Sequence, residues 1–462
     1  MDRDTHASRP RRGTMRRRVR SICGRALIGA LLAALGSMSA GCARTPEESD
    51  SAVPPPSLQH KLEEITRRVP PWVAAGGDHA RIAPLGQQVE ACLRGRRYRE
   101  AEAVADQILG TLSEPTGTSA SRAHGRRATP VAPGVNLPRE HAPGLQAFTD
   151  ILDMFAAQRM NVFGFPVDWR DLEPSPRVYA LDEPFKPLTL VVPRYPTLEA
   201  VVLVVRMIDT NARPMPADLV TRRFNDPELM ERFVALFDAV AARPGIARVT
   251  HVLLGNEVNA YLGNHRDEAE DFALFFRRAA AHVRRRLPGV RVGTILTHAG
   301  VRGWPDLFQR LKADSDFIAY SYYPIDGQWR MRPVREVEAD LAFLAKQADE
   351  KPFAFTEIGY SASPLNASSE AQQAEFVRTV FRALGPYHEA GRIEFILYHT
   401  LHDYPPEFCQ PYAAVQGLGQ SEEFCAFVEH LGLWSYATGR PRPAWDAFAE
   451  GVRRWTTDGP AS

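Results

Sequence analysis

Short apolar runs alternate with amphipathic stretches along most of this chain of 462 residues. An apolar run bounded by Gly or Pro is typical of a strand buried on both faces. Apolar residues that recur at helical spacing are typical of a helix with one buried face. The predicted strands lie at 162–165, 200–207, 249–254, 290–296, 317–320, 353–356 and 395–398. The predicted helices lie at 146–158, 227–242, 268–287, 336–348, 370–384 and 443–455.

The alternation of these strands and helices predicts the fold. Strands separated by helices pair in parallel, and a further strand near 134–136 brings their number to eight. We therefore expect an α/β protein, a (β/α)8 TIM barrel over residues 134–456, preceded by a small helical N-terminal extension. One segment conflicts with the pattern: residues 183–196 should hold the helix between the second and third strands, but four prolines interrupt them.

The residues just before the barrel fall into three segments. Residues 58–112 have helical periodicity and form the extension; they resemble one helical hairpin of a tetratricopeptide-like repeat, without a second copy. Residues 113–133 are rich in Ser, Thr, Gly, Pro and Arg, which predicts a linker. Residues 43–57 are polar and Pro-rich, which suits a tether.

Residues 1–42 contain the three parts of a secretory signal: an arginine block, an apolar run at 26–35, and small residues before Cys42. The run is too short to span a bilayer as a permanent helix. Its end resembles the lipobox of bacterial lipoproteins, in which the Cys is lipidated, although Ser39 stands where Leu is usual. The resemblance implies an exported protein anchored through a lipid on Cys42 to the bacterial cell envelope, on the periplasmic or surface side of the outer membrane. The alternative is a plain signal peptide with an incidental Cys, and Met15 is a second possible start.

Composition and motifs exclude several kinds of function. The net charge of +1 provides no field that would attract nucleic acid. The sequence lacks Cys-x-x-Cys and His-x-x-x-His motifs and the common nucleotide-binding glycine motifs, so neither a metal nor an organic cofactor is predicted. Disulfides are allowed in an exported protein. Cys409 and Cys425 are close enough in sequence to close a surface loop, whereas Cys92 lies on an apolar helix face and is expected to be buried.

Two predicted strands, far apart in the sequence, each end in a glutamate. Asn256-Glu257 ends the fourth strand and Glu357 ends the seventh. The C-terminal ends of barrel strands form the active site of a (β/α)8 enzyme, and two carboxylates there are what glycoside hydrolysis requires. Burial raises the pKa of a glutamate, so Glu257 can act as an acid, and an ionised Glu357 can attack the anomeric carbon. Asn256 can donate to a sugar hydroxyl beside the cleaved bond.

The order of these motifs resembles that of the retaining (β/α)8 glycoside hydrolases of clan A, which include cellulases, mannanases, β-galactosidases and endo-β-1,4-galactanases. The shared features are Asn-Glu after the fourth strand, Tyr323-Pro324 after the sixth, Glu357 after the seventh and an aromatic residue after the eighth. Residues 168–174 and 433–445 also resemble segments of that group. The resemblance implies a retaining glycosidase that hydrolyses O-glycosidic bonds of a β-linked oligo- or polysaccharide by double displacement, with Glu257 as acid/base and Glu357 as nucleophile.

Several residues near the same strand ends are candidates for substrate binding. Tyr322 and Tyr323 point to opposite sides of their strand, and the resemblance favours Tyr323 as the partner of Glu357. Trp169 could stack on a sugar or lie in the core, and Arg206 could bind substrate or form a structural ion pair. The candidates are Asn256, Tyr323, Trp169, Tyr398, His399 and Arg206, of which Tyr398 and His399 stand where this group usually has Trp. We expect His402 and Asp403 to shape the sugar site rather than to bind a metal, because no third ligand is evident.

Two other functions stay open on the sequence alone. One is a non-catalytic carbohydrate-binding or cell-envelope assembly lipoprotein on a barrel scaffold, although the presence of both glutamates and Asn256 argues against it. The other is a transglycosylase, which differs only in whether water or a sugar hydroxyl takes the intermediate. The expected partners are a carbohydrate substrate and, through the lipid, a membrane. The sequence defines neither the sugar, nor exo or endo action, nor the oligomeric state.

Overall fold

The computed structural model describes residues 54–74, 82–113, 129–133, 145–418 and 421–456. The chain divides into two compact units, residues 1–121 and 122–462, which are described separately. Cys42, the predicted signal and most of the predicted tether lie outside the described residues. No described helix is both long enough and apolar enough to cross a membrane.

Three helices make up the described part of the first unit: α2 (Pro56–Ala74), α3 (Ala83–Arg94) and α4 (Tyr98–Ser113). Each helix is amphipathic, and the three apolar faces meet in a small core of their own. Leu62 of α2, Cys92 of α3 and Ile108 of α4 belong to this core, and Cys92 is a free thiol. The extension is therefore a three-helix unit, which differs from the single hairpin that its sequence resembles.

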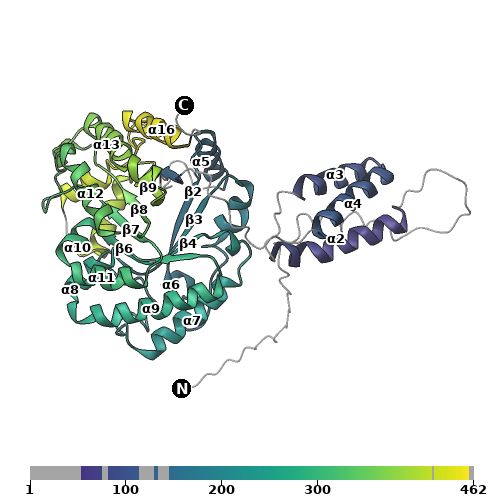
Figure 1. The fold of residues 1–462 in the computed structure, drawn as a ribbon, viewed down its shortest axis with the longest axis horizontal. Helices are drawn as coiled ribbons and strands as arrows, with labels where there is room; N and C mark the ends of the chain where they lie inside the picture. The colour runs from purple at the N-terminus through teal and green to yellow at the C-terminus, as the bar shows by residue number, and fades with distance from the viewer. Residues whose placement is uncertain (1–53, 75–81, 114–128, 134–144, 419–420, 457–462) are drawn as a thin grey trace, which may run out of the picture. The chain divides into compact units, whose positions relative to one another are not determined.

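The second unit has parallel strands at its centre and helices around them (Figure 1). The strands form two ladders in the orders β2-β3-β4-β5 and β6-β7-β8-β9-β1, and every pairing is parallel. The strands are β1 (Val131–Pro133), β2 (Val162–Asp168), β3 (Ala200–Asp209), β4 (His251–Asn256), β5 (Arg291–Gly293), β6 (Ile295–Thr297), β7 (Ile318–Tyr322), β8 (Phe353–Ile358) and β9 (Ile393–Tyr398).

Two features join the ladders into a closed barrel. Only Thr294 separates β5 from β6, so these short strands share one strand position, and Thr294 Oγ1 donates to the Leu254 carbonyl of β4 at 2.7 Å. On the other side, Asn161 just before β2 donates its N–H to the Val131 carbonyl of β1 at 3.3 Å, and its Oδ1 accepts from Val131 N at 3.1 Å. The described strands thus fill eight positions, and the predicted (β/α)8 barrel is confirmed.

Helices cover the outside of the barrel (Figure 1). Local sequence sets where they begin: α7 starts at Pro227 directly after Asp226, whose carboxylate accepts from the Glu228 N–H at 2.9 Å. Their inward faces are apolar, as with the buried Phe233 and Phe237 of α7. The main helices are α5 (Leu145–Ala157), α7 (Pro227–Ala241), α8 (Val258–Asn264), α9 (Ala269–Arg286), α10 (His298–Gly303), α11 (Pro305–Asp314), α12 (Val337–Gln347), α13 (Glu370–Glu389) and α16 (Pro443–Thr456).

One local prediction is wrong, and one conflict in the sequence pattern is explained. The first strand is Val131–Pro133, inside the segment expected to be a linker, because its position is set by pairing with β9 rather than by a long apolar run; residues 134–136 lie outside the described residues. The segment between β2 and β3 contains only short turns: α6 (Trp169–Leu172), a π-turn at Pro187–Val191 and a 3-10 turn at Val192–Arg194. The prolines there remove N–H donors and prevent a longer helix.

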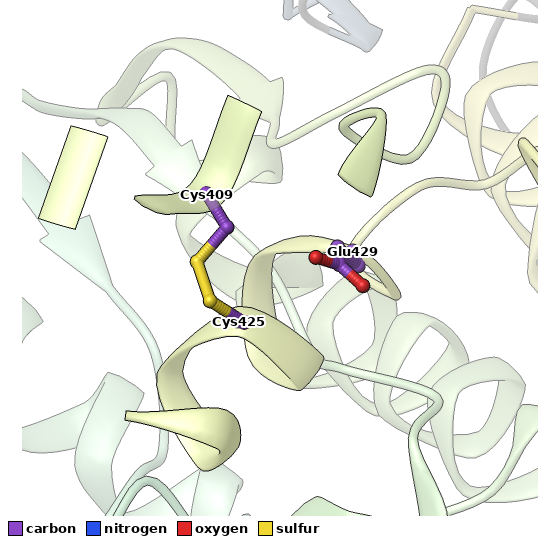
Figure 2. A group of neighbouring side chains, drawn as sticks. All are labelled: Cys409, Cys425 and Glu429. Atoms are coloured by element: carbon purple, nitrogen blue, oxygen red, sulfur yellow. A yellow bond between two sulfur atoms is a disulfide. The ribbon is translucent and has the colours of Figure 1, made fainter. Parts of the chain in front are cut away.

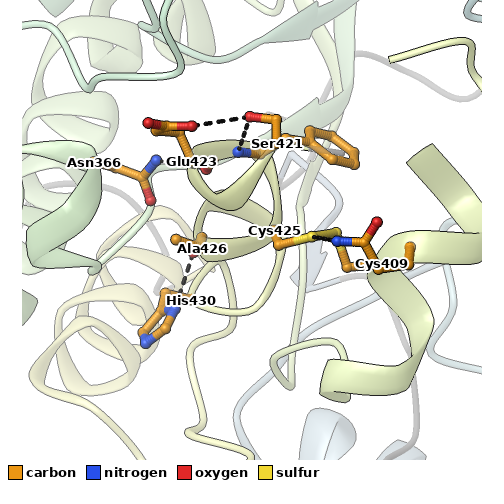
Figure 3. The surroundings of a disulfide bond; sticks show 9 residues. Asn366, Cys409, Ser421, Glu423, Cys425, Ala426 and His430 are labelled. Carbon is orange, nitrogen blue, oxygen red and sulfur yellow. Dashed lines mark hydrogen bonds between the residues drawn. A yellow bond between two sulfur atoms is a disulfide. The ribbon is translucent and has the colours of Figure 1, made fainter. Parts of the chain in front are cut away.

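After β9 the chain forms two short helices, α14 (Pro406–Val415) and α15 (Glu422–Val428). A disulfide between Cys409 and Cys425 joins them (Figures 2 and 3). Asn366, which follows β8, lies beside Glu423 (Figure 3) and donates through Nδ2 to the Glu423 carbonyl at 2.8 Å. The two helices are therefore attached to each other and to the loop after β8.

A buried ion pair anchors the start of this segment. The Asp403 carboxylate contacts Arg442, just before α16, through two oxygens at 2.6 and 2.7 Å. It also accepts the N–H groups of Gly432 and Tyr436 at 2.9 and 3.0 Å. All of its hydrogen-bonding capacity is used inside the protein, so Asp403 holds this segment in place and does not itself bind a ligand.

Candidate active site

The two predicted catalytic glutamates lie at the C-terminal ends of β4 and β8. Glu257 is the first residue after β4, and Glu357 is the second-last residue of β8. Ser321 of β7 is in register with Glu357, and its hydroxyl donates to Glu257 Oε1. A side chain from the strand beside one glutamate therefore reaches the other, which places both carboxylates at the same mouth of the barrel.

Two hydroxyls hold the Glu257 carboxylate. Thr210 Oγ1, just after β3, donates to Oε2 at 2.8 Å, and Ser321 Oγ donates to Oε1. Glu257 and Thr210 both have left-handed backbone, with φ of 46° and 53°, and Thr210 N donates to the Asn256 carbonyl at 3.1 Å. Such a φ is a genuine outlier for a β-branched residue and costs about 1–3 kcal/mol. The strained turns after β3 and β4 bring the two side chains together.

The Glu357 carboxylate has a different set of partners. Tyr323 OH donates to Oε2 at 2.7 Å, and Asn256 Nδ2 donates to Oε1 at 3.3 Å. Asn256 Nδ2 also donates to Asp209 Oδ1 at 3.0 Å. Tyr323 is thus the tyrosine that faces Glu357, as the family resemblance favours, whereas Tyr322 faces outward and donates to a carboxylate of α12 at 3.0 Å.

Arg206 of β3 adds a positive charge beside Glu357. Its Nη2 lies 2.6 Å from Asp168 Oδ1, and its Nη1 lies 3.2 Å from Asp209 Oδ2. Burial lowers the pKa of Arg206, but the two carboxylates raise it further, so the guanidinium stays charged. This charge in turn lowers the pKa of Glu357. Arg206 therefore forms the structural ion pair that the sequence left open, and its charge also lowers the pKa of Glu357.

Burial raises the pKa of both glutamates. For Glu257, burial and then the charge of Glu357 raise the pKa to about 7, against the two hydroxyl donors, which lower it. For Glu357, burial and the charge of Asp209 raise the pKa, and the tyrosine and amide donors and the nearby guanidinium lower it, so that the pKa lies above its usual value. An amide NH₂ can only donate and therefore favours an ionised carboxylate, whereas Ser and Thr hydroxyls donate or accept and fit either form. The arrangement favours a protonated Glu257 beside an ionised Glu357.

His399 lies beside this pair, directly after β9. Its ring centroid is 6.2 Å from that of Tyr323, and its Nε2 is 3.1 Å from the Tyr404 hydroxyl. Burial lowers the pKa of His399 to about 4, so the ring is neutral near pH 7. The site thus has an imidazole where the family resemblance leads one to expect an indole.

Trp169 does not reach the site. It has no exposed surface, its ring packs against Phe233 with centroids 5.7 Å apart, and its Nε1 donates to Glu173 Oε2 at 2.9 Å. The short helix α6 begins at this residue, directly after β2, and the indole is buried in the core. The predicted stacking of Trp169 on a sugar is wrong.

Tyr398 is also buried away from the mouth. Only 2% of its surface is exposed, and its ring packs against Phe448 of α16 with centroids 5.8 Å apart. Neighbouring residues along a strand point to opposite faces, so Tyr398 faces the outer helices while His399 lies near the glutamates. The predicted substrate-binding role of Tyr398 is wrong.

Two residues of the site have no counterpart among the sequence predictions: Thr210 and Ser321. Ser321 precedes Tyr323 by two positions and therefore lies on the same face of the strand. The alternation of side chains could thus have predicted that Ser321 faces the site. Thr210 has no such signal, because its contact depends on the left-handed turn after β3.

One cluster among the described residues has the composition of a metal site: Cys409, Cys425 and Glu429 (Figure 2). Both sulfur atoms are joined in the disulfide, and a zinc site needs free thiolates. The cluster therefore serves as a cross-link between α14 and α15.

Comparisons with known proteins support the architecture. No protein-family model and no curated protein matches the chain. Among solved structures, GH5_18 from Streptomyces cattleya in complex with GlcNAc matches with 22% identity, 73% of this chain and 82% of that chain covered, and a TM-score of 0.54. GH5_18 from Bifidobacterium longum subsp. longum matches with 16% identity, 73% and 81% coverage, and a TM-score of 0.57. The exo-beta-1,4-mannosidase Op5Man5 from Opitutaceae bacterium strain TAV5 matches with 20% identity, 72% and 60% coverage, and a TM-score of 0.51. At these identities the likeness establishes the fold.

Proposed function

We propose that this protein is a retaining glycoside hydrolase that acts on β-linked sugars, with Glu257 as acid/base and Glu357 as nucleophile. The observation that carries the proposal is that the two carboxylates have different hydrogen-bond partners. Glu357 accepts from a tyrosine and from an amide, beside a guanidinium, whereas Glu257 contacts only hydroxyls that can also accept. One buried carboxyl holds a proton and the other a charge, which is the division that this reaction requires.

The reaction then proceeds in two balanced steps. In the first, an ionised Glu357 oxygen bonds to the anomeric carbon, the bond from that carbon to the leaving oxygen breaks, and Glu257 gives its proton to that oxygen. The new ester removes the charge of Glu357, which is the second-largest cause of the raised pKa of Glu257. Glu257 therefore becomes a stronger acid and stays ionised, as a base must. In the second step it takes a proton from water, whose oxygen bonds to the anomeric carbon and releases Glu357.

Variants of the two glutamates test this assignment. Glu357→Ala is expected to abolish turnover on every substrate. Glu257→Ala is expected to keep a fast first step on activated aryl β-glycosides, to stall as the glycosyl-enzyme, and to regain turnover with added azide. Glu389→Ala, an exposed glutamate at the end of α13, is the matched control and should keep full activity. Full activity of Glu357→Ala contradicts the proposal.

The stereochemistry of the product tests the retaining mechanism. Retention requires carboxyl groups about 5–5.5 Å apart, and inversion requires a separation of about 6.5–9.5 Å. We expect the first product to have the β configuration by NMR. Formation of the α anomer would reassign Glu357 from nucleophile to base.

The choice of sugars follows from the structural neighbours, which include a mannosidase and a GlcNAc complex. Aryl β-mannosides, β-glucosides, β-galactosides and β-N-acetylglucosaminides form the first panel. Product analysis with added acceptor sugars separates hydrolysis from transglycosylation. Sugar binding without turnover on the whole panel would favour the non-catalytic carbohydrate-binding alternative.

We also propose that the protein is exported and held at the cell envelope through a lipid on Cys42. The support is the arginine block, the short apolar run and the small residues that precede this Cys. Cys42→Ala is expected to move the protein from the membrane fraction to the soluble fraction. An unchanged distribution in cell fractionation would reject the anchor.

A further inference from the structure

Tyr322 lies between two residues at the end of β7 that act on different glutamates. Ser321 before it donates to Glu257, and Tyr323 after it donates to Glu357. Side chains alternate along a strand, so the ring of Tyr322 points away from the barrel mouth, where it is fully buried. The position of this one residue therefore affects the hydrogen bonds of both carboxylates.

The Tyr322 side chain is held by the outer helices. Its hydroxyl donates to Asp340 Oδ2 of α12 at 3.0 Å. Its ring packs against Phe376 of α13 and His298 of α10, with centroids 6.4 and 5.5 Å apart. Asp340 is 4% exposed and lies in the first turn of α12, where the helix dipole favours a negative charge. A buried carboxylate outside the barrel thus anchors the end of β7.

The same carboxylate also holds the chain on the other side of Tyr323. Arg332 Nη1 donates to Asp340 Oδ2 at 2.7 Å, and the Arg332 N–H donates to the Pro324 carbonyl at 2.7 Å. Pro324 directly follows Tyr323. The residues before and after this tyrosine are therefore both tied to Asp340, which limits how far the phenol can move from Glu357.

The strand that carries Glu357 is bonded to the same segment. Gly359 N donates to the Tyr322 carbonyl at 3.2 Å, and Tyr360 OH donates to the Arg332 carbonyl at 2.9 Å. Both donors follow Glu357 by two or three residues. The nucleophile and the tyrosine that donates to it therefore share one support.

The surroundings of Asp340 compensate its charge. On α10, His298 Nε2 and Arg302 Nη2 lie 3.4 and 3.5 Å from Asp340 Oδ1. Burial lowers the pKa of His298, so this ring is neutral near pH 7. Glu336, just before α12, contacts Arg332 at 2.7 Å and shares that guanidinium with Asp340. Two guanidiniums therefore face the carboxylate, which keeps a buried charge in place.

We propose that Asp340 is a positioning residue of the sugar site. Through Tyr322 and Arg332 it holds the end of β7 where both donors reach their glutamates. Small displacements are sufficient to disturb the site, because hydrogen bonds weaken steeply as their geometry departs from the preferred one. This inference rests on the proposed glycosidase function and extends it to a residue outside the barrel that does not contact the sugar.

The pH dependence of kcat/KM on an aryl β-glycoside with a poor leaving group is the first test. Asp340→Ala leaves the buried Tyr322 hydroxyl without its acceptor, so the end of β7 shifts and both donors bind their glutamates less well. Each donor lowers the pKa of the glutamate that it contacts. Both limbs of the profile should therefore move to higher pH, each by about half a unit. Tyr322→Phe keeps the ring and should move both limbs in the same direction, but less.

Two further variants separate positioning from charge and from stability. Asp340→Asn keeps an oxygen that accepts from Tyr322 but removes the charge, so it should restore both limbs to the wild-type pH. Tyr320→Phe is the matched control, because the buried Tyr320 donates to the Leu344 carbonyl of the same helix at 3.0 Å. Tyr320 is paired with β6 on one side and β8 on the other, whereas the pairing of β6 with β7 ends at Ser321. Tyr320→Phe should lower the thermal unfolding midpoint about as much as Tyr322→Phe and move neither limb.

Three results overturn the positioning role and leave the glycosidase assignment intact. The first is that both limbs stay at the wild-type pH in Asp340→Ala and Tyr322→Phe. The second is that the limbs move equally in Asp340→Asn and Asp340→Ala, which would assign the effect to the charge. The third is that Tyr320→Phe moves the limbs as far as Tyr322→Phe, which would assign it to stability.

A second measurement tests the positioning role without turnover. If the protein hydrolyses none of the aryl glycosides, the proposed function fails, but both carboxyl groups can still be titrated by carbon-13 NMR. The signals are assigned with Glu257→Gln and Glu357→Gln. We expect both pKa values to be higher in Tyr322→Phe and in Asp340→Ala than in the wild type and in Tyr320→Phe. Equal pKa values in all four proteins overturn the inference.

Discussion

Removal of the Ser321 hydroxyl is expected to make Glu257 a weaker acid. The hydroxyl donates to Glu257 Oε1 and stabilises its ionised form, so Ser321→Ala raises the pKa of Glu257 from about 7. A hydrogen bond to a charged group contributes about 1.5–3 kcal/mol, and one pKa unit corresponds to about 1.4 kcal/mol. Water replaces part of the lost bond in this partly exposed site, so we expect a rise of about one unit.

The pH dependence of kcat/KM measures this shift. An aryl β-glycoside with a poor leaving group makes the first step depend on the proton of Glu257, so the basic limb reports the pKa of that carboxyl in the free enzyme. The limb should move from about pH 7 to about pH 8 in Ser321→Ala. Ser315→Ala is the matched control, because this buried serine near the opposite end of the same strand donates only to the Leu311 carbonyl.

Two results would refute this reasoning. A basic limb that moves to lower pH would mean that the Ser321 hydroxyl stabilises the protonated form of Glu257. A limb that stays in place in Ser321→Ala, or moves equally in Ser315→Ala, would mean that a different group donates the proton.

Three further outcomes follow from contacts described above. Tyr323→Phe removes a donor from ionised Glu357, whose pKa should rise, so the acidic limb of kcat/KM should move to higher pH by up to about one unit; a limb that moves down would contradict this. Asp403→Ala removes the buried carboxylate that contacts Arg442 twice and leaves it only the exposed Glu370, 3.2 Å from its Nε, so the free energy of unfolding should fall by about 3 kcal/mol in urea denaturation, against a change near zero for the exposed Glu389→Ala. Reduction of the disulfide, whose cysteines are 16 residues apart, should lower that free energy by about 3 kcal/mol, and peptide mapping that finds both thiols free in the native protein would reject the bond.

Local sequence was sufficient for the barrel strands after the first and for both glutamates, whereas β1 is set by its pairing with β9. An apolar run that ends in a polar residue defines both the strand and the residue at its C-terminal end, so Glu257 and Glu357 could be placed at one mouth without further information. Trp169 could not be placed, because the direction of an indole after a strand depends on where the chain turns next. Thr210 could not be placed either, since its contact with Glu257 joins the loops that follow β3 and β4. Side chains that depend on long-range contacts have no local pattern.

The ion pair between Asp403 and Arg442 makes completion of the sugar site a late event in the life of the chain. Synthesis proceeds from the N-terminus, so Asp403 is made 39 residues before Arg442. Until Arg442 has joined the fold, the Asp403 carboxylate has no countercharge and cannot be buried at low cost. A barrel that already holds both glutamates would therefore still lack the folded segment after β9. Fragments that end before Arg442 should be inert, so catalytic activity would report that nearly the whole chain has been made and folded.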